Sequence, residues 1–507
     1  MPTYQRLRLV LLSLVLVSVT ALVYRWHSTN DQPLRPLTTP AEQQQQQQQS
    51  AIQPASYDRN DPRIAKVLDN IDQKYCGGPC RFMLPVFIME QESKAQMHFR
   101  QLAFMAGMLN RTIVLPNVGG SRLGACLEHD FTFYYSKAWA HDNAEHFSHI
   151  SLDKFSAWVK ERKAVGFPST SQTFHVHLSA DHKQIGETNN CFAPLMDSTG
   201  WPDKSIYLHD SGNVRRRKKY QKIFYDFFTE KEEHRVDSDN APEVMSVYYD
   251  RRFPFIQHPA SEEPIPYNER ITNMADELAT SLSPYLAVHW RTERAEPAEA
   301  LVGCAESLGE LIKDRSGQLG LTTQPTFFLL TDYPHIFDPS FVDQAVKDNT
   351  TDTLKKTEGE AGFVPASASF SPDSLTIYHH RAIHYLYSNF QVTVTSLESD
   401  MTDTTKSPAN WTVLPVSKDL ANHDSGVLGI IDKLMAIRAD LFIAGKPGVC
   451  ARRSSFTGRI VDERIARRIE ELKDTQQWMD DDSIEEWTDY SRKGSGRMKN
   501  IIEYFEL

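Results

Sequence analysis

Apolar positions in the first part of the globular chain fall into two short runs separated by a stretch with helical spacing. Residues 82–89 and 112–115 are apolar runs that predict buried strands, and residues 96–109 carry apolar side chains at the spacing of a helix. Two strands joined by a helix in this order favour a parallel pair with a right-handed crossover. This part of the chain is therefore predicted to begin an α/β domain.

The same alternation returns beyond residue 270 and continues almost to the C-terminus. Because residues 61–507 exceed what one hydrophobic core usually holds, we expect two domains. We predict an α/β fold with two Rossmann-like domains facing a cleft, one over residues 61–275 and one over residues 276–507. Helices are predicted over residues 271–282, 298–313, 375–388, 427–439 and 460–472, and strands over residues 285–290, 326–330, 392–394 and 441–444.

The N-terminus combines an apolar run with positive charge. Arg6 and Arg8 precede the uncharged residues 9–24. A cleaved signal peptide is the alternative to an uncleaved anchor, but the large residues 24–26 leave no good small-residue cleavage site. We therefore predict a cytosolic tail over residues 1–8 and a signal-anchor transmembrane helix over residues 9–24, in a single-pass type II membrane protein.

A polar, proline-bearing segment follows the predicted anchor. Residues 25–60 include the glutamine run 43–49 and almost nothing that could form a core, so we predict a disordered stem. The short apolar span suits the thinner membranes of the early secretory pathway. The globular part is therefore expected in the lumen of the Golgi apparatus or the endoplasmic reticulum.

Cysteines and glycosylation sequons agree with a lumenal location. The sequence holds six cysteines, an even number that fits disulfide bonds in an oxidising compartment. Cys76 and Cys80 are expected to form a local disulfide, because no second cysteine or histidine pair accompanies them as it would in a metal site. Sequons predict glycosylation at Asn349, Asn410 and Asn110, the last at a helix end where we expect burial.

Charge argues against one class of partner. The formal net charge is −11, so the chain lacks the basic balance of a nucleic-acid-binding protein. Residues 215–219 are a basic exception. They are either the solvated start of an amphipathic segment or a contact for an acidic partner or anionic lipid headgroups.

Two polar segments follow predicted strands in the C-terminal half. Ligands of open α/β sheets bind outside the carboxyl ends of the strands. An arginine guanidinium at such a position suits a diphosphate, and serine hydroxyls and backbone N–H groups can bind the same anion. The pattern therefore predicts a nucleotide-diphosphate site. Its residues are His289, Trp290 and Arg291 after one run, and Ser454, Ser455 and Phe456 after another.

Three short islands of sequence occur in a fixed order. They are His98-Phe99 with residues 109–116, the motif at 289–291, and the segment that runs from Asp432 through residues 439–443 and the double serine to Arg464. Together they resemble the GDP-fucose protein O-fucosyltransferase-like family, whose two Rossmann-like domains face each other in a GT-B-like arrangement. The resemblance implies a glycosyltransferase that transfers fucose from GDP-fucose to a hydroxyl of a protein or glycan acceptor, with inversion.

The resemblance also implies roles for the domains and residues. The domain over residues 61–275 would lie on the acceptor side, and the domain over residues 276–507 would bind the nucleotide sugar. Neither a cofactor nor a metal is expected, because an arginine and loop N–H groups would neutralise the departing GDP. Arg291 would hold the diphosphate with His289 and Trp290 in the same motif, Asp432 would contact the guanine, and Ser454, Ser455 and Phe456 would contact the donor.

The loop after the first strand departs from the family pattern. In the family this loop is rich in glycine and ends in asparagine, whereas residues 89–96 contain neither, and Lys94 would place a cation there. An inverting transfer needs a base. Glu92 in this loop is the predicted catalytic base, although it would also suit a helix N-terminus. Glu90 and Glu293 are the other nearby carboxylates.

Two alternatives remain open at this level. A transferase of the same fold could use another nucleotide sugar. A catalytically inert Golgi protein could keep the fold and bind glycans or a partner. Loss of the glycine-rich loop favours the inert protein, while Arg291 and the double serine favour the enzyme.

Overall fold

The structure is a computed structural model of the 507-residue chain. It describes residues 61–177, 190–207, 217–229, 241–249, 255–293, 295, 297–320, 326–333, 343–344, 346–347, 375–397, 411–421, 424–474 and 498–507. The predicted tail, anchor, stem and the sequons at Asn349 and Asn410 lie outside these residues. Within them, no helix is long and apolar enough to cross a bilayer.

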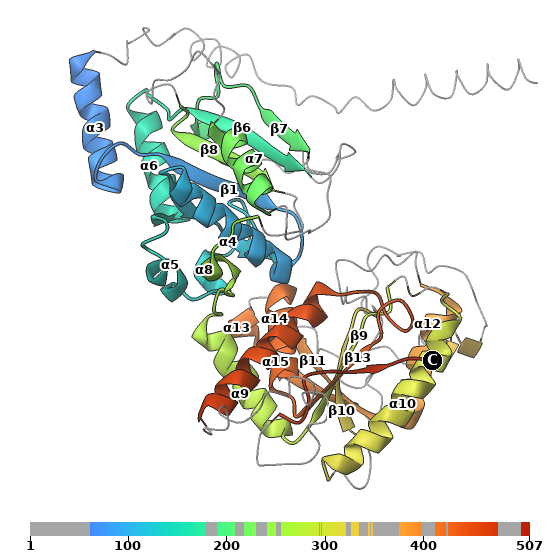
Figure 1. Cartoon of the computed structure of the whole chain (residues 1–507). Helices are drawn as coiled ribbons and strands as arrows, with labels where there is room; N and C mark the ends of the chain where they lie inside the picture. The colour runs from blue at the N-terminus through green and yellow to red at the C-terminus, as the bar shows by residue number, and fades with distance from the viewer. Residues whose placement is uncertain are drawn as a thin grey trace, which may run out of the picture. The chain divides into compact units, whose positions relative to one another are not determined.

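The first sheet has eight strands and comes from the N-terminal half (Figure 1). The path β3-β4-β1-β8-β6-β7 runs across it, and β2 joins β1 to β5. All pairs are parallel except those that β4 makes with β1 and β3. The strands are β1 (Phe82–Ile88), β2 (Thr112–Leu115), β3 (Val118–Gly119), β4 (Arg122–Leu123), β5 (His149–Ser151), β6 (Ser171–His177), β7 (Lys204–Tyr207) and β8 (Val244–Tyr249).

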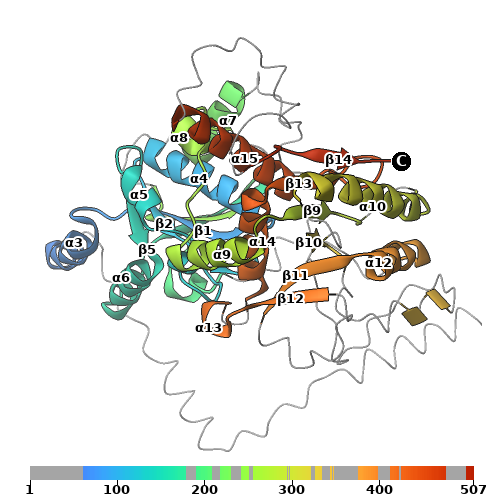
Figure 2. The ribbon, with the colours of Figure 1, turned by 90° about the horizontal axis from the view of Figure 1, so that it is seen from below.

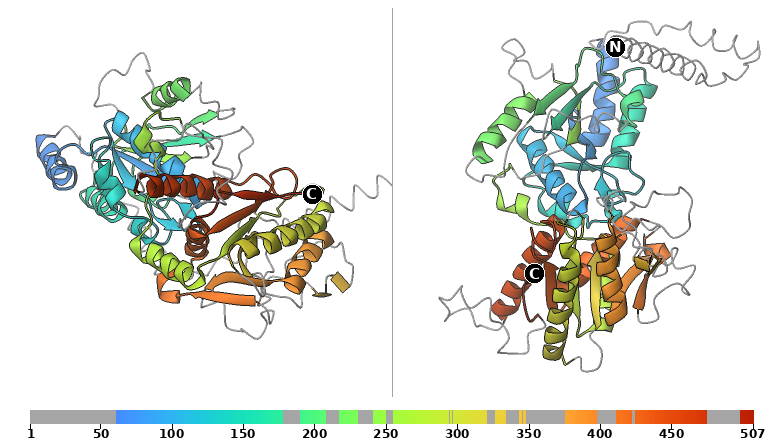
Figure 3. Two further views of the ribbon diagram at one scale, coloured as in Figure 1. Left: turned by 60° about the horizontal axis from the view of Figure 1, so that its bottom comes forward. Right: turned by 90° about the vertical axis from the view of Figure 1, so that its right-hand side faces the viewer.

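Helices lie on both faces of this sheet, with α6 and α7 on opposite sides (Figures 1 and 3). Alternate β1 residues divide between two cores, because successive side chains of a strand point to opposite faces. Met83 joins the core that contains α4 and α7, whereas Phe82 joins the core that contains α6. The helices are α3 (Pro62–Cys76), α4 (Glu92–Met108), α5 (Ala138–Asp142), α6 (Leu152–Ala164), α7 (Arg217–Thr229) and α8 (Pro259–Glu262), with 3₁₀ turns η1 (Phe131–Phe133) and η3 (Ala193–Leu195).

The second sheet has six parallel strands in the order β12-β11-β10-β9-β13-β14. Helices α14 and α15 lie on one side of it and α10 and α12 on the other (Figure 2). The strands are β9 (Leu286–Trp290), β10 (Thr326–Thr331), β11 (Gln391–Leu397), β12 (Trp411–Val416), β13 (Leu441–Gly445) and β14 (Glu503–Phe505). The helices are α9 (Glu269–Leu282), α10 (Ala300–Gln318), α12 (Ile377–Asn389), α13 (Lys418–Ala421), α14 (Ser425–Arg438) and α15 (Ser455–Asp474).

These sheets confirm the predicted α/β class with parallel strands. Residues 66–507 form one compact unit, and the proposed boundary at 275/276 falls inside α9. That helix packs against α14, which covers the second sheet. The division into two domains, and its position, therefore stay predictions.

The structure tests the predicted disulfide bonds and the expected burial of Asn110. All six cysteines are bonded, as Cys76–Cys80, Cys126–Cys191 and Cys304–Cys450, so the predicted local pair is confirmed. Asn110 is exposed in a left-handed turn after α4, with φ of 52°. The expectation that Asn110 is buried was wrong, because the turn carries it out of the helix–strand contact.

Candidate functional site

The end of β9 presents successive side chains to opposite faces of the second sheet. Ala287, two residues before His289, belongs to the core under α14 and α15, whereas Val288 and Trp290 belong to the core under α10 and α12. His289 therefore lies on the α14–α15 face. His289 and Trp290, which are adjacent in the sequence motif, therefore lie on opposite faces of the sheet.

Trp290 is a core residue of the second sheet. Its indole is completely buried, donates from Nε1 to the carbonyl of Cys450 at 2.9 Å and packs edge-on against Phe505. Cys450 is in turn bonded to Cys304 of α10. The side chain therefore points to the α10 side of the sheet, and the role of Trp290 in donor binding stays a prediction.

His289 connects β9 to the N-terminus of α15. Its Nδ1 lies 2.8 Å from the Thr457 hydroxyl, and its ring centroid lies 5.1 Å from that of Phe456. Burial, with the charge of Arg291 as a second cause, lowers the pKa of His289 to about 3. The imidazole is therefore neutral near neutral pH. When Nδ1 accepts from Thr457, Nε2 carries the proton and can donate it to a ligand.

The double serine begins α15. Ser454 caps the helix, since its hydroxyl accepts from the backbone N–H groups of Phe456 at 3.2 Å and Thr457 at 3.4 Å. Ser455 is the first residue of the helix and is exposed. The positive end of a helix favours an anion. The structure thus brings His289 together with Phe456 and the predicted serines.

Arg291 belongs to a cluster of two guanidinium groups around one buried carboxylate. Its Nη2 lies 2.6 Å from Oε2 of Glu293, and Nη1 of Arg452 lies 3.4 Å from the other carboxylate oxygen. The Glu293 side chain is 5% exposed, whereas that of Arg291 is 21% exposed. Two positive charges share one negative charge, so the cluster has a surplus of positive charge beside accessible guanidinium.

Asp332, at the end of β10, holds the backbone that carries this cluster. Its oxygens accept from the N–H and hydroxyl of Thr292 at 2.7 and 2.9 Å and from the N–H of Glu293 at 2.9 Å. Burial raises the pKa of Asp332, and these hydrogen bonds oppose the rise. The carboxylate thereby fixes the turn that follows β9 instead of facing a ligand.

Asp432 lies on α14 and contacts the neighbouring strand β11. It accepts a short hydrogen bond from the Thr395 hydroxyl. Burial raises its pKa to about 7, although the Thr395 hydrogen bond lowers it. Asp432 is therefore close to half-ionised near neutral pH, and one added donor group would be enough to favour the carboxylate.

Glu92 forms a buried ion pair, which does not suit the predicted base. Its Oε2 contacts the ammonium of Lys433 on α14, and both side chains are nearly inaccessible. Its Oε1 accepts from Gln96, Tyr135 and Tyr267 at 2.8, 3.1 and 2.7 Å. Burial raises the pKa of Glu92, but the Lys433 charge and these hydrogen bonds outweigh it and leave the pKa below its ordinary value.

The position of Glu92 explains this difference. We expected a loop over residues 89–96, but α4 already begins at Glu92 because no glycine or proline interrupts the helix-forming residues that follow. Glu90 has the positive φ, 96°, that glycine usually supplies. Lys94 is paired with Glu90 at 3.1 Å, so the cation expected in this loop is partly neutralised.

Several residues of the site escaped sequence reasoning. Thr457 gave no signal, because nothing in its spacing marks it as a partner of His289. Lys433 did give one, since it interrupts the apolar run of a buried helix.

Arg464, in the third sequence island, is fully buried and its Nη1 donates to the carbonyls of Ala436, Ile437 and Ala439 at the end of α14. It therefore stabilises the helix terminus. Within the described ranges, no group of three or more metal-binding side chains occurs.

Comparison with known proteins gives structural neighbours only. No protein-family model and no curated protein matches the sequence. The chain is similar to crystal structures of POFUT1, one with GDP-fucose (14% identity, TM-score 0.37, covering 77% of this chain and 95% of that one) and one with GDP (14%, 0.36, 76% and 96%). It is also similar to the fucosyltransferase NodZ from Bradyrhizobium (13%, 0.32, 75% and 91%). At these low scores, functional inference rests on this chain's own residues.

Proposed function

We propose that this protein is a glycosyltransferase that transfers fucose from GDP-fucose to a hydroxyl of a protein or glycan, with inversion and without a metal. The observation that supports it is the convergence of the 289–291 motif with the N-terminus of α15 through the His289–Thr457 contact. A cationic cluster, a neutral histidine and a helix N-terminus together suit a diphosphate.

Each group has a distinct part in the proposed reaction. The Arg291 guanidinium binds the diphosphate and meets the charge that grows on GDP as the sugar–phosphate bond breaks. Arg452 supports it through the shared Glu293 carboxylate. The neutral His289 donates from Nε2, and the positive end of α15 attracts the same phosphate oxygens. Asp432 accepts from the guanine base.

The proposed base is Glu90 in place of Glu92. Both belong to the segment after β1, but the Glu90 side chain is 17% exposed and that of Glu92 is 7% exposed. A base has to reach the acceptor hydroxyl within hydrogen-bond distance. We expect Glu90→Gln to lower kcat at least 100-fold with GDP affinity unchanged, whereas Glu92→Gln should mainly lower thermal stability. Unchanged turnover in Glu90→Gln would rule out this assignment.

The test of the proposed function is an unbiased acceptor array. The full-length protein is incubated with labelled GDP-fucose and, separately, with other labelled nucleotide sugars, with and without EDTA. We expect transfer from GDP-fucose that EDTA does not change. Transfer from another donor alone would show that the enzyme uses a different nucleotide sugar. GDP binding without transfer from any donor would favour the catalytically inert binding protein.

Membrane topology is a separate part of the proposal. Arg6, Arg8 and the apolar residues 9–24 support a type II anchor with the globular part in the lumen. In intact microsomes, a C-terminal tag should resist protease until detergent is added. Digestion without detergent would place the globular part in the cytosol.

Asp432 predicts how donor binding depends on pH. A carboxylate accepts from guanine only when ionised, so binding has to release the proton that Asp432 holds below its pKa of about 7. GDP affinity should therefore rise by roughly tenfold between pH 6 and pH 8. Calorimetry in buffers of different ionisation enthalpy should detect nearly one proton released at pH 6. Proton release that persists in Asp432→Asn would assign it to another group.

A further inference from the structure

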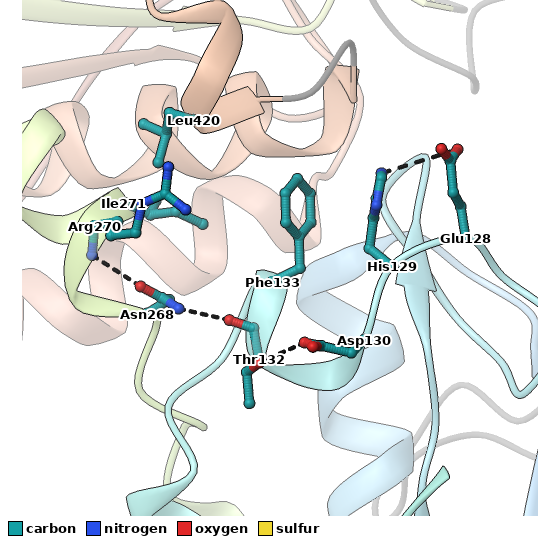
Figure 4. A pocket seen from close by; sticks show the side chains of 9 residues that line it. All are labelled: Glu128, His129, Asp130, Thr132, Phe133, Asn268, Arg270, Ile271 and Leu420. Atoms are coloured by element: carbon teal, nitrogen blue, oxygen red, sulfur yellow. Dashed lines mark hydrogen bonds and ion pairs between the residues drawn. The ribbon is translucent and has the colours of Figure 1, made fainter. Parts of the chain in front are cut away.

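A polar cavity lies where the segment between β4 and η1 meets α9 and α13 (Figure 4). Its volume is about 380 Å³, at the small end of the range for ligand sites. None of its residues is among those proposed to bind the donor. The lining comprises Glu128, His129, Asp130, Thr132, Phe133, Asn268, Arg270, Ile271 and Leu420.

The cavity combines an aromatic surface with hydrogen-bond donors and hydrogen-bond acceptors. The Phe133 ring stands between Arg270 and His129 in Figure 4, and its centroid lies 4.1 Å from that of His129. Ile271 and Leu420 are buried and add apolar surface. Among the residues that the structure describes, Arg270 has no carboxylate partner, and its Nη2 contacts only the Asp419 carbonyl, at 3.2 Å.

The polar groups are held in place by neighbouring backbone. Asn268 donates to the Thr132 carbonyl at 2.6 Å and accepts from the Arg270 N–H at 2.9 Å. Asp130 accepts from the Thr132 hydroxyl. The two sides of the cavity are therefore connected by hydrogen bonds, and the acceptors and donors around it have fixed positions.

The charged side chains around the cavity disfavour an anionic ligand. Glu128 and Asp130 place two carboxylates at the rim against the single guanidinium of Arg270, so a phosphate or another anion would be repelled. Carboxylate oxygens accept from hydroxyl groups, while guanidinium and amide groups donate to them. A sugar ring presents hydroxyls at its edge and C–H groups on its face, and the latter suit the Phe133 ring.

We propose that this cavity binds a neutral saccharide. Its position also suggests what the saccharide is for. Nε2 of His129 lies 3.8 Å from the carboxylate of Asp424, which caps α14, and Asp432 follows on the same helix about 12 Å along its axis. On the proposed function, the saccharide is the acceptor or a part of it; the binding itself does not depend on that function.

The test measures saccharide binding without any donor. The full-length protein in detergent is examined by saturation-transfer NMR with chitotetraose, mannotriose, xylotriose and N-acetyllactosamine, and with 3′-sialyl-N-acetyllactosamine as the anionic probe. At least one neutral probe should bind, and the sialylated one should bind at least tenfold more weakly than its neutral parent. Phe133→Ala should weaken binding of the neutral probe at least tenfold. Asp130→Asn, a milder change at an exposed position, should weaken it about threefold.

Two controls separate the possible failures. Tyr225→Ala removes an exposed aromatic ring of α7, outside the cavity, and should leave saccharide binding unchanged. GDP titration of every variant reports on the donor site alone and should match the wild type. The proposal is overturned if no neutral probe binds, if only the anionic probe or a peptide binds, or if binding survives both cavity substitutions. Loss of GDP binding with intact saccharide binding would instead contradict the proposed function.

Discussion

Replacing Arg291 by alanine is expected to abolish measurable sugar transfer while the protein stays folded. The guanidinium lies directly after β9, is partly exposed and should bind the departing diphosphate most strongly in the transition state. By analogy with removal of one oxyanion donor, the loss is at least about 3 kcal/mol, or more than 100-fold in kcat/KM. Folding should survive, because Arg452 stays beside the buried Glu293 carboxylate.

Two comparison variants sharpen this expectation. Arg291→Lys keeps one positive charge but loses the planar two-pronged geometry, so it should recover little activity. Arg315→Ala removes a similarly exposed arginine of α10, in the same half of the chain, that pairs with Glu503 of β14. It should leave turnover near the wild-type value. Turnover is measured with labelled donor, and the thermal midpoint controls for folding. Near-normal turnover in folded Arg291→Ala would remove Arg291 from the mechanism.

Lys433→Met is expected to cause the largest loss of stability among single substitutions at the site. The change leaves the Glu92 carboxylate buried without its cation, and breaking a buried ion pair in this way costs about 3–5 kcal/mol. Lys433 also lies 5.0 Å from the centre of the Tyr267 ring and 6.0 Å from that of Phe456. Its loss should therefore disturb the start of α15 and weaken GDP binding as well.

A double-mutant cycle separates the ion pair from the space it fills. Glu92→Gln/Lys433→Met replaces both charges and should be more stable than Lys433→Met alone. The control is Lys222→Met in the exposed Lys222–Asp226 pair of α7, which should change stability by less than about 1 kcal/mol. Thermal midpoints are compared at one pH. A Lys433→Met protein as stable as this control would show that the ion pair contributes little.

The sequence predicted the second sheet well, because its strands are short continuous apolar runs. Residues 441–444 and 326–330 were expected as strands and are found within β13 and β10. β12 and β14 were not predicted. Glu503–Phe505 of β14 is too short and polar to show a pattern and depends on pairing with β13. Helix starts were the weakest predictions. α15 begins at Ser455 and not at residue 460, and Ser454 caps it.

The candidate site was predictable where one residue type has one chemistry, as for the Arg291 guanidinium, which the structure places partly exposed after β9. It was not predictable where burial decides the role. Trp290 and Glu92 carry groups that could bind a ligand, but the face of β9 and the contact with Lys433 commit them to packing and pairing. Such choices depend on which elements meet, and local sequence does not contain that information.

The most direct measurement of the central claim is a calorimetric titration of the full-length protein with GDP, GMP and UDP. If the cluster around Arg291 and the start of α15 bind a diphosphate, GDP should bind at least tenfold more tightly than GMP, which lacks the second phosphate. If Asp432 contacts the base, GDP should also bind more tightly than UDP. The Arg291→Ala substitution should lower the affinity for GDP to the affinity for GMP. Equal affinities for GDP and GMP, or no binding of GDP, would contradict the account.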